Sequence, residues 1–508
     1  MPGGRIKKSI LNLSFNYINQ ILILILSFIS RTVFIHYLSI EYLGINGLFS
    51  DILELLSMAD LGFNTAMSYS FYKPLAEKDY KKIAGLTTFY KKVYNIIAIV
   101  VTVLGLSVVP FLRKIINLDK NIPNLEVYYL FSLAGIVVTY LFVYRTSIVT
   151  ADQNNYILTR ISMIVSVIKV VAQILVLMLF RSYIVYLCIN IISAIVCNVI
   201  AANKAVKLYP QIKEKESLSK SEQKDILYNM KSIFIYKVSS VLLNATDNLL
   251  ISTIIGTIAV GYYSNYLMIV NRITMFYGLI FSSLTASIGN LIVKEEKRKR
   301  YEVFQCEQAV SFFISGIIIP CYMVLVNDFI NVWLGDKFLF EFSVVLAIGF
   351  NMYLACIFQP LWSYREATGL YQKTKWVMAL CALINIVLSV ILGSTIGLVG
   401  IIMASCISRI LTYAWYEPII LFKTYFGVSP KKYFISNIKN IMIVLVITIA
   451  INKISGVFLI DSWIKLILKG VVIFCICIIM MFLIYRKSEG IQILVKRVSK
   501  IKESVWLK

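Results

Sequence analysis

Long apolar segments, each followed by a short polar connection, repeat along almost the whole chain. A helix needs about 20 largely apolar residues to cross a bilayer, and we count about 14 such segments. They are 11–38, 43–70, 93–112, 127–149, 161–180, 183–203, 231–255, 261–291, 307–327, 342–363, 376–393, 397–421, 439–457 and 464–485. The pattern predicts an all-α polytopic membrane protein, and an even number of spans places both termini on one side.

The longest polar connection falls midway along the first twelve segments. It predicts two six-helix lobes in parallel topology, related by an axis along the membrane normal, followed by two further helices. The expected parts are a lobe at 1–208, a cytoplasmic linker at 209–230, a second lobe at 231–425, two helices at 426–487 and a basic tail at 488–508. The tail has helical apolar spacing and predicts a helix on an anionic leaflet. A helix against the protein's own underside fits equally well.

The amino-acid composition supports a membrane protein and argues against several other classes of protein. The chain has 508 residues, is 59% hydrophobic and carries a formal charge of +24. Most Lys and Arg lie in connections on one side, which predicts cytoplasmic termini and explains the charge as topology, not as nucleic-acid binding. The single histidine, His36, and cysteines confined to apolar segments argue against a metal site. No connection is long enough for a folded catalytic domain, so we expect no enzyme.

The first two segments carry charges that the bilayer opposes. Arg31, Asp51, Glu54 and Asp60 lie among apolar residues. Each would cost about 2.5 to 3.5 kcal/mol at the bilayer centre, or about 10 kcal/mol together. These side chains must therefore pair inside the protein or line a hydrated path.

A second hairpin carries charges of opposite sign at equivalent depth. Arg31 precedes Gly44 by 13 residues and Asp247 precedes Gly261 by 14. Glu54 follows the first glycine by 10 residues and Arg272 follows the second by 11. One hypothesis is that Arg31 faces Asp247, and Glu54 faces Arg272, across the interface between the lobes and closes an outer gate. The alternative is that these charges only fasten helices within each lobe.

Further cations stand in the predicted spans at Arg145 and Arg409. With Arg31 and Arg272, they predict a cavity that prefers an anionic substrate. The planar guanidinium group donates two parallel hydrogen bonds to phosphate. The acids Asp247, Glu54, Asp51 and Asp60 are candidates for gating or ion coupling.

Several short motifs resemble the bacterial polysaccharide flippases of the Wzx type. The first set is Arg31, Gly44 and Asp60-Leu61-Gly62-Phe63, followed by the basic connection at 73–82. The second is the run Asp247–Ser252 with Gly256 and then Val260-Gly261-Tyr262-Tyr263-Ser264. These flippases belong to the multidrug/oligosaccharidyl-lipid/polysaccharide exporter superfamily, with the lipid II flippases and the MATE transporters.

The resemblance implies a transporter that works by alternating access in the bacterial cytoplasmic membrane. Its cargo would be a polyprenyl-diphosphate-linked oligosaccharide for surface polysaccharide, moved from the inner to the outer leaflet. Arg31 and Arg272 would hold the diphosphate. No cofactor is expected, and a proton or sodium gradient or the membrane potential would drive turnover. Membrane lipids and polysaccharide assembly proteins are candidate partners. A MATE-like drug or cation antiporter is the alternative, and a membrane polymerase or glycosyltransferase fits less well.

Overall fold

The computed structural model describes residues 2–57, 63–117, 122–282, 284, 288, 291–292, 295–455 and 460–496. Within these ranges the chain is helical and has no strand, which confirms the predicted all-α fold. Two units are defined by internal packing, Met1–Gly261 and Tyr262–Lys508. The predicted boundary between lobes lies earlier, in the linker, and the lobe assignment stays a prediction.

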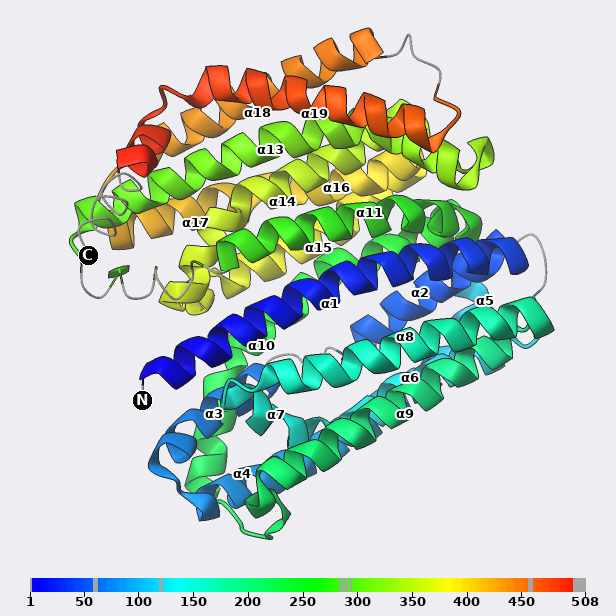
Figure 1. Ribbon diagram of the computed structural model, residues 1–508, viewed down its shortest axis with the longest axis vertical. Helices are drawn as coiled ribbons and strands as arrows, with labels where there is room; N and C mark the ends of the chain where they lie inside the picture. The colour runs from blue at the N-terminus through cyan, green and yellow to red at the C-terminus, as the bar shows by residue number, and fades with distance from the viewer. Residues whose placement is uncertain are drawn as a thin grey trace. The chain divides into compact units, whose positions relative to one another are not determined.

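The first unit contains the helices from α1 to α10 (Figure 1). They are α1 (Pro2–Tyr37), α2 (Ile40–Leu56), α3 (Phe63–Glu77), α4 (Tyr80–Val108), η2 (Val109–Phe111), α5 (Leu112–Ile115), α6 (Leu125–Tyr140), α7 (Val143–Ala151), α8 (Asn155–Phe180), α9 (Tyr183–Leu208), η3 (Pro210–Lys213) and α10 (Lys220–Ile254). The next helix, α11 (Thr257–Ser282), begins in this unit and continues into the second.

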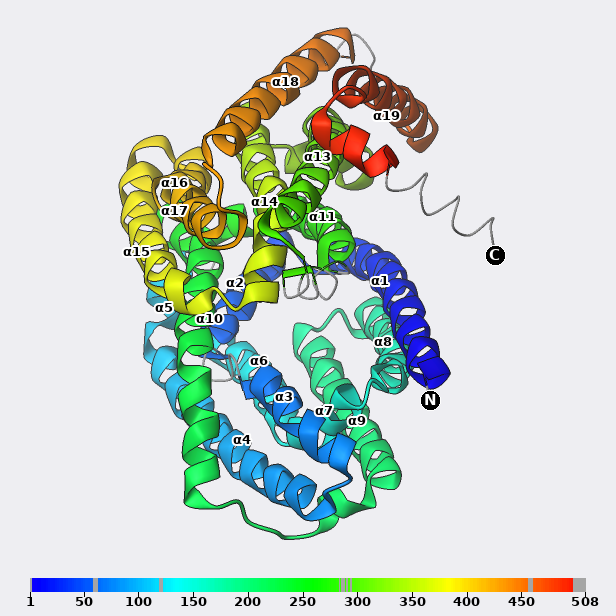
Figure 2. The same cartoon turned by 90° about the vertical axis from the view of Figure 1, so that its left-hand side faces the viewer.

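The second unit contains the remaining helices. They are α13 (Lys297–Leu334), η4 (Asp336–Phe338), α14 (Phe342–Thr368), α15 (Tyr371–Ile396), α16 (Leu398–Leu411), α17 (Tyr413–Leu421), the π-helical turn η5 (Phe422–Phe426), α18 (Lys431–Ser455) and α19 (Trp463–Tyr485). Helices α18 and α19 pack on α13 (Figure 2). Ile317, Ile447, Ile473 and Met481 form part of the core between them.

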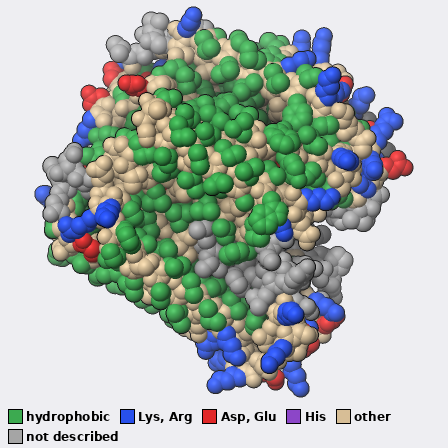
Figure 3. Space-filling model, turned by 180° about the vertical axis from the view of Figure 1, so that it is seen from behind, with side chains coloured by type: hydrophobic (Ala, Val, Ile, Leu, Met, Phe, Trp, Pro, Cys, Tyr) green, Lys and Arg blue, Asp and Glu red, His purple; other side chains and the backbone are tan. Residues whose placement is uncertain are grey.

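Ten described helices are long and apolar enough to cross a membrane, or eleven if the bent pair α6–α7 is one span. The expected count of about 14 is therefore not confirmed. Helices α2, α10 and α11 are not among the ten, and they carry Asp51, Asp247 and Arg272. Arg31 and Arg409, by contrast, lie on helices that are among the ten. On the face in Figure 3, hydrophobic side chains dominate the middle and Lys and Arg lie toward the edges.

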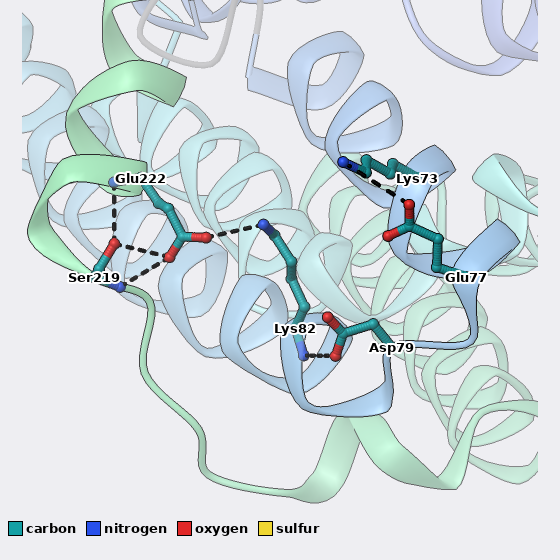
Figure 4. A network of polar contacts seen from close by, with 6 residues as sticks. All are labelled: Lys73, Glu77, Asp79, Lys82, Ser219 and Glu222. Atoms are coloured by element: carbon teal, nitrogen blue, oxygen red, sulfur yellow. Dashed lines mark hydrogen bonds and ion pairs between the residues drawn. The ribbon is translucent and has the colours of Figure 1, made fainter.

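A polar network fixes the start of α10 to α4 (Figure 4). Ser219 and Glu222 form a reciprocal cap at the first turn of α10, which satisfies backbone N–H groups that the helix itself leaves unpaired. Lys82 Nζ donates to Glu222 at 2.9 Å, and Asp79 caps α4 by accepting from the Lys82 backbone N–H at 2.9 Å. The predicted linker is therefore joined to α4 by the contact between Glu222 and Lys82.

The beginning of the tail lies on the second unit. Glu489 accepts from Lys432 at 2.7 Å and from Gln305 at 3.1 Å. Gly490 packs directly against Gln305 and Ala309 of α13, where a side chain would collide. Residues 489–496 are helical, and residues 497–508 lie outside the described part of the chain. The start of the tail therefore follows the second of its two predicted placements, against the protein itself.

Candidate functional site

Helices α2 and α10 pack together in the first unit and bring polar side chains into the protein interior. Asn248 of α10 donates its amide to the Asp51 carboxylate of α2. Asp247 is buried beside this contact, and both Asp247 and Glu54 interact electrostatically with Asp51. We call Asp51, Glu54, Asp247 and Asn248 the polar seam. Three of its four members are acids, of which Asp247 is buried, Asp51 is half-buried and Glu54 is exposed.

Close backbone contacts hold one end of the polar seam. Gly44 of α2 lies against the backbone carbonyl of Thr257, where an added Cβ would collide. Gly261 lies reciprocally against the carbonyl of Ile40, and its Cβ would be 2.9 Å from that oxygen. Only glycine permits such close backbone approach. Gly44 therefore contacts the first residue of α11, and Gly261 contacts the first residue of α2.

Hydrogen bonds reinforce this junction. Ser252 donates to the carbonyl of Ile115 at 2.8 Å and shares a 2.7 Å hydrogen bond with Thr257. The Thr257 backbone N–H donates to the carbonyl of Asn117 at 2.9 Å. In an apolar surrounding these bonds satisfy groups that would otherwise be costly to bury. The end of α10 is thus fastened rigidly to α5.

The remaining sequence-predicted residues of the first unit lie on other helices. Arg31 of α1 is half-buried and interacts electrostatically with Tyr186 of α9. Arg145 of α7 is also half-buried, with its guanidinium carbon 5.4 Å from the ring centre of Tyr144. Asp60 lies outside the described residues. The pairing of Arg31 with Asp247 joins two residues of the same unit and stays a prediction.

In the second unit, an apolar groove of about 480 Å³ runs between α11, α13 and α19. Ile269, Ile273, Phe276, Ile318, Leu325 and Phe474 are among its lining residues. Arg272 of α11 is half-buried and lies three residues after Ile269 and four before Phe276. This spacing places all three on neighbouring positions of one helical face. Arg272 is not itself a lining residue of the groove; it lies on the same helix, between the lining residues Ile269 and Ile273.

Arg409, the other predicted cation, is buried on α16. Its Nη1 donates to the Asn351 amide oxygen of α14 at 2.7 Å. Arg272 and Arg409 belong to the second unit and Arg31 and Arg145 to the first. The pairing of Glu54 with Arg272 joins residues of different units and stays a prediction, as does any shared cavity.

A buried ion pair in the second unit was not predicted from the sequence. Arg365 of α14 donates to both carboxylate oxygens of Glu417 on α17, each at 3.2 Å. The two side chains are 8% and 2% exposed. The pattern places Arg365 near the membrane surface, whereas the structure buries it. An acid within the predicted span 397–421 was the available signal.

Two other polar groups of the second unit, Glu307 and Lys469, also differ from the sequence-based expectation. Glu307 of α13 is buried, and its Oε2 has no hydrogen-bond partner among the described residues. Lys469 lies near the start of its predicted span, where a lysine can extend to the interface. In the structure it instead donates to Asp328 at 2.7 Å. This pair joins α19 to α13.

Comparison with known proteins shows which family the chain belongs to. The sequence model described as "Polysaccharide biosynthesis protein" matches residues 9–285, more than half of the chain. The chain belongs to this family. The uncharacterized membrane protein EpsK of Bacillus subtilis (strain 168) is 29% identical over 187 residues. The match covers 36% of this chain and 36% of EpsK, so the chain aligns with about a third of that relative.

Solved structures show the fold. The lipid II flippase MurJ in an inward closed conformation has a TM-score of 0.66 and 16% identity, with 95% of this chain and 99% of that one covered. A MATE family multidrug resistance transporter in an inward-facing conformation has a TM-score of 0.56 and 14% identity, with 78% and 93% covered. The family member thus shares the overall helical fold of these two proteins.

These findings confirm the resemblance to Wzx-type flippases of the exporter superfamily. The family member is a multi-pass membrane protein with the fold of these solved transporters. Among the described residues, no group of His, Cys, Asp and Glu could hold a metal ion. The roles of Arg31, Arg145, Arg272, Arg409 and the acids of the polar seam stay predictions.

Proposed function

We propose that this protein moves a polyprenyl-diphosphate-linked oligosaccharide from the inner to the outer leaflet of the bacterial cytoplasmic membrane. Such a cargo has a long apolar tail joined to a dianionic headgroup. Family membership supports a role in polysaccharide biosynthesis. One structural neighbour, MurJ, is a lipid II flippase, and this likeness supports a lipid-linked cargo.

The proposal rests on helix α11, which carries Arg272 and also lines the apolar groove. The groove offers hydrophobic surface for part of a polyprenyl chain, and burial of apolar area is the main attraction available there. Arg272 offers the planar donor group that suits a phosphate. The two features lie on neighbouring positions of α11, as the two chemical parts of the cargo require.

Alternating access requires that one end of the transporter can close. The reciprocal glycine contacts of Gly44 and Gly261 support a role for this junction in closing the end that the sequence predicts to be extracytoplasmic. The acids of the polar seam are our candidates for coupling transport to a proton or sodium gradient or to the membrane potential.

Leaflet-specific detection of the lipid-linked glycan in a deletion strain tests the proposal. Wild-type protein should restore glycan in the outer leaflet. Replacing Arg272 with Gln should lower the transport rate about tenfold or more, because charge-assisted hydrogen bonds contribute about 1.5 to 3 kcal/mol. Arg298→Gln is the matched control, since Arg298 is an exposed cation at the start of α13.

Three results would decide the outcome. Normal outer-leaflet glycan in the deletion strain, without a second flippase gene, would refute the proposed cargo. Equal transport by the Arg272→Gln and Arg298→Gln proteins would refute the role of Arg272 alone. Changed drug accumulation with unchanged glycan would favour the antiporter function instead.

A further inference from the structure

A second groove, unrelated to the proposed cargo path, lies between α8 and α9 of the first unit. These helices run side by side (Figures 1 and 2). The groove has a volume of about 620 Å³. Its apolar part is lined by Ile157, Ile161, Ile164 and Ile200. Ile164 and Ile200 are 60% and 45% exposed, so a large hydrophobic surface is open to the membrane.

Cations gather along the same groove. Arg160, Lys204 and Lys207 line it with Asn203 and Tyr156. All three basic side chains are exposed, and none has an acidic partner within the described ranges. The nearby acid Asp152 is already engaged, because it accepts hydrogen bonds from Asn154 at 2.8 Å and Tyr209 at 2.7 Å. The three charges are therefore available to a ligand.

Helical spacing explains why these residues share the groove. On α9, the series Ile200, Asn203, Lys204 and Lys207 follows the three- and four-residue steps of one helical face. On α8, Ile157, Arg160, Ile161 and Ile164 do the same. On α9, Ile200 lies farther into the predicted span, and Lys204 and Lys207 lie toward its predicted cytoplasmic end. On α8, Ile161 and Ile164 lie farther into the predicted span than Arg160.

Helix α1 holds the α8 end of the groove in position. Asn12 accepts from the Tyr156 backbone N–H at 2.7 Å and donates to the Gln153 carbonyl at 2.8 Å. Phe15 stacks on Tyr156 with ring centres 6.2 Å apart, and the Arg160 guanidinium carbon lies 5.7 Å from the Phe15 ring centre. These contacts restrain Arg160 before any ligand binds, which lowers the entropy lost on binding.

We propose that this groove is a binding site for an anionic glycerophospholipid of the inner leaflet. The phosphodiester headgroup contacts Arg160, Lys204 and Lys207, and an acyl chain covers the four isoleucines. Charge complementarity selects the headgroup, because anionic lipids attract basic segments at the cytoplasmic surface. The predicted orientation of the chain places these cations on that side. The inference goes beyond the flippase function, since the site lies on α8 and α9 and not on α11.

Native mass spectrometry of the full-length protein in detergent tests the site directly. The probes are phosphatidylglycerol and, as a zwitterionic comparison, phosphatidylcholine. The triple variant Arg160→Gln, Lys204→Gln, Lys207→Gln should bind phosphatidylglycerol about 100-fold more weakly, at about fivefold for each cation near an anionic headgroup. Binding of phosphatidylcholine should change little.

A matched control removes the same charge elsewhere. Lys213, Lys215 and Lys220 are exposed residues of the predicted linker and the start of α10, and their replacement by Gln should leave phosphatidylglycerol binding unchanged. Equal affinity of the two triple variants would overturn the proposal, because net charge alone would then explain binding. Dependence of polyprenyl phosphate binding, but not phosphatidylglycerol binding, on the three cations would also overturn it.

A second variant tests the apolar half of the groove and keeps the cations. Ile200→Trp fills the space beside α8 and should displace the tightest phosphatidylglycerol molecule. Unchanged lipid binding by Ile200→Trp would show that no acyl chain lies in the groove and would overturn the proposal. The outcome is independent of glycan flipping, which is measured separately.

Discussion

Two carboxyl groups, Asp51 in the first unit and Glu417 in the second, are held in different ways. In the first unit Asp51 accepts a hydrogen bond from the neutral amide of Asn248, with two more acids nearby. In the second unit Glu417 is neutralised by Arg365 through two contacts of 3.2 Å. A neutralised pair holds two helices in one arrangement. A seam of acids with a neutral donor can take up a proton or cation, so the polar seam has the chemistry of a coupling site and the Arg365–Glu417 pair that of a fastener.

Breaking the fastener should give the largest effect. Glu417→Gln leaves the Arg365 guanidinium buried without its counter-charge, and losing one partner of a buried pair costs about 3 to 5 kcal/mol. The measurement is the free energy or midpoint of unfolding in detergent. Glu307→Gln is the control, because Glu307 is a buried acid of the same unit without an ion pair in the described part of the chain. We expect Glu307→Gln to change stability by less than about 1 kcal/mol.

A double variant tests whether the loss of stability comes from the uncompensated charge of Arg365. Arg365→Met combined with Glu417→Leu should recover most of the stability lost by Glu417→Gln, because well-packed apolar residues often replace buried pairs without loss. Equal destabilisation by Glu417→Gln and Glu307→Gln would contradict the distinction between a paired and an unpaired buried acid.

A smaller loss of stability is expected in the polar seam. Asp51→Leu removes the acceptor of the Asn248 amide and leaves that donor buried, which costs about 1 to 3 kcal/mol. Asp51→Asn retains an acceptor oxygen and removes the charge. It should therefore keep stability within about 1 kcal/mol but reduce transport if charge uptake drives turnover.

The exposed Glu54 supplies the comparison for this prediction. Glu54→Gln should leave unfolding unchanged within about 0.5 kcal/mol, as most surface substitutions do. Transport by the Asp51→Asn protein at the wild-type rate, under each ion gradient, would exclude Asp51 as the coupling residue while leaving the flippase proposal intact.

The hydrophobic pattern was enough to predict an all-helical membrane fold, because the bilayer requires helices of a minimum apolar length. The pattern could not predict how far each helix extends beyond its apolar segment. The segment expected at 307–327 lies inside α13, which runs from Lys297 to Leu334. Hydropathy detects only the apolar part of a helix, so it placed Glu307 at the first residue of a predicted span. In the structure Glu307 is buried and lies ten residues after the start of α13.

The candidate site was predictable only in part. Asp51 and Asp247 stand out because charges are rare within apolar segments. Their arrangement depends on tertiary packing, so the contact of Asp51 with Asn248 could not be read from spacing. The pair Arg365–Glu417 joins residues 52 apart in sequence on helices α14 and α17. A search for charges in every predicted span, extended beyond the first two hairpins, would have identified Glu417 as a candidate.

The surface contact that anchors α10 should give the smallest effect, and its sign follows from protonation. The hydrogen bond from Lys82, with help from Ser219, lowers the pKa of Glu222 below its ordinary value of 4.5. A carboxyl group with a lower pKa in the folded state stabilises the fold above its unfolded pKa. That contribution is lost as the pH falls through the folded value, so the relevant window lies below about pH 4.5. Exposed pairs contribute at most about 1 kcal/mol.

Comparing wild-type protein with Glu222→Gln isolates this group. At pH 7 the wild-type protein should be slightly more stable, and the difference should vanish as acidification protonates Glu222. Glu216→Gln is the matched control, because Glu216 is an exposed acid of the same linker. A stability difference for Glu222→Gln that persists below the folded pKa would show that the side chain acts through packing and not through its charge. High salt should also reduce the difference at pH 7, since exposed pairs are screened. The contact of Asp51 with Asn248 has a neutral donor and is partly buried, so it should respond less to this salt change.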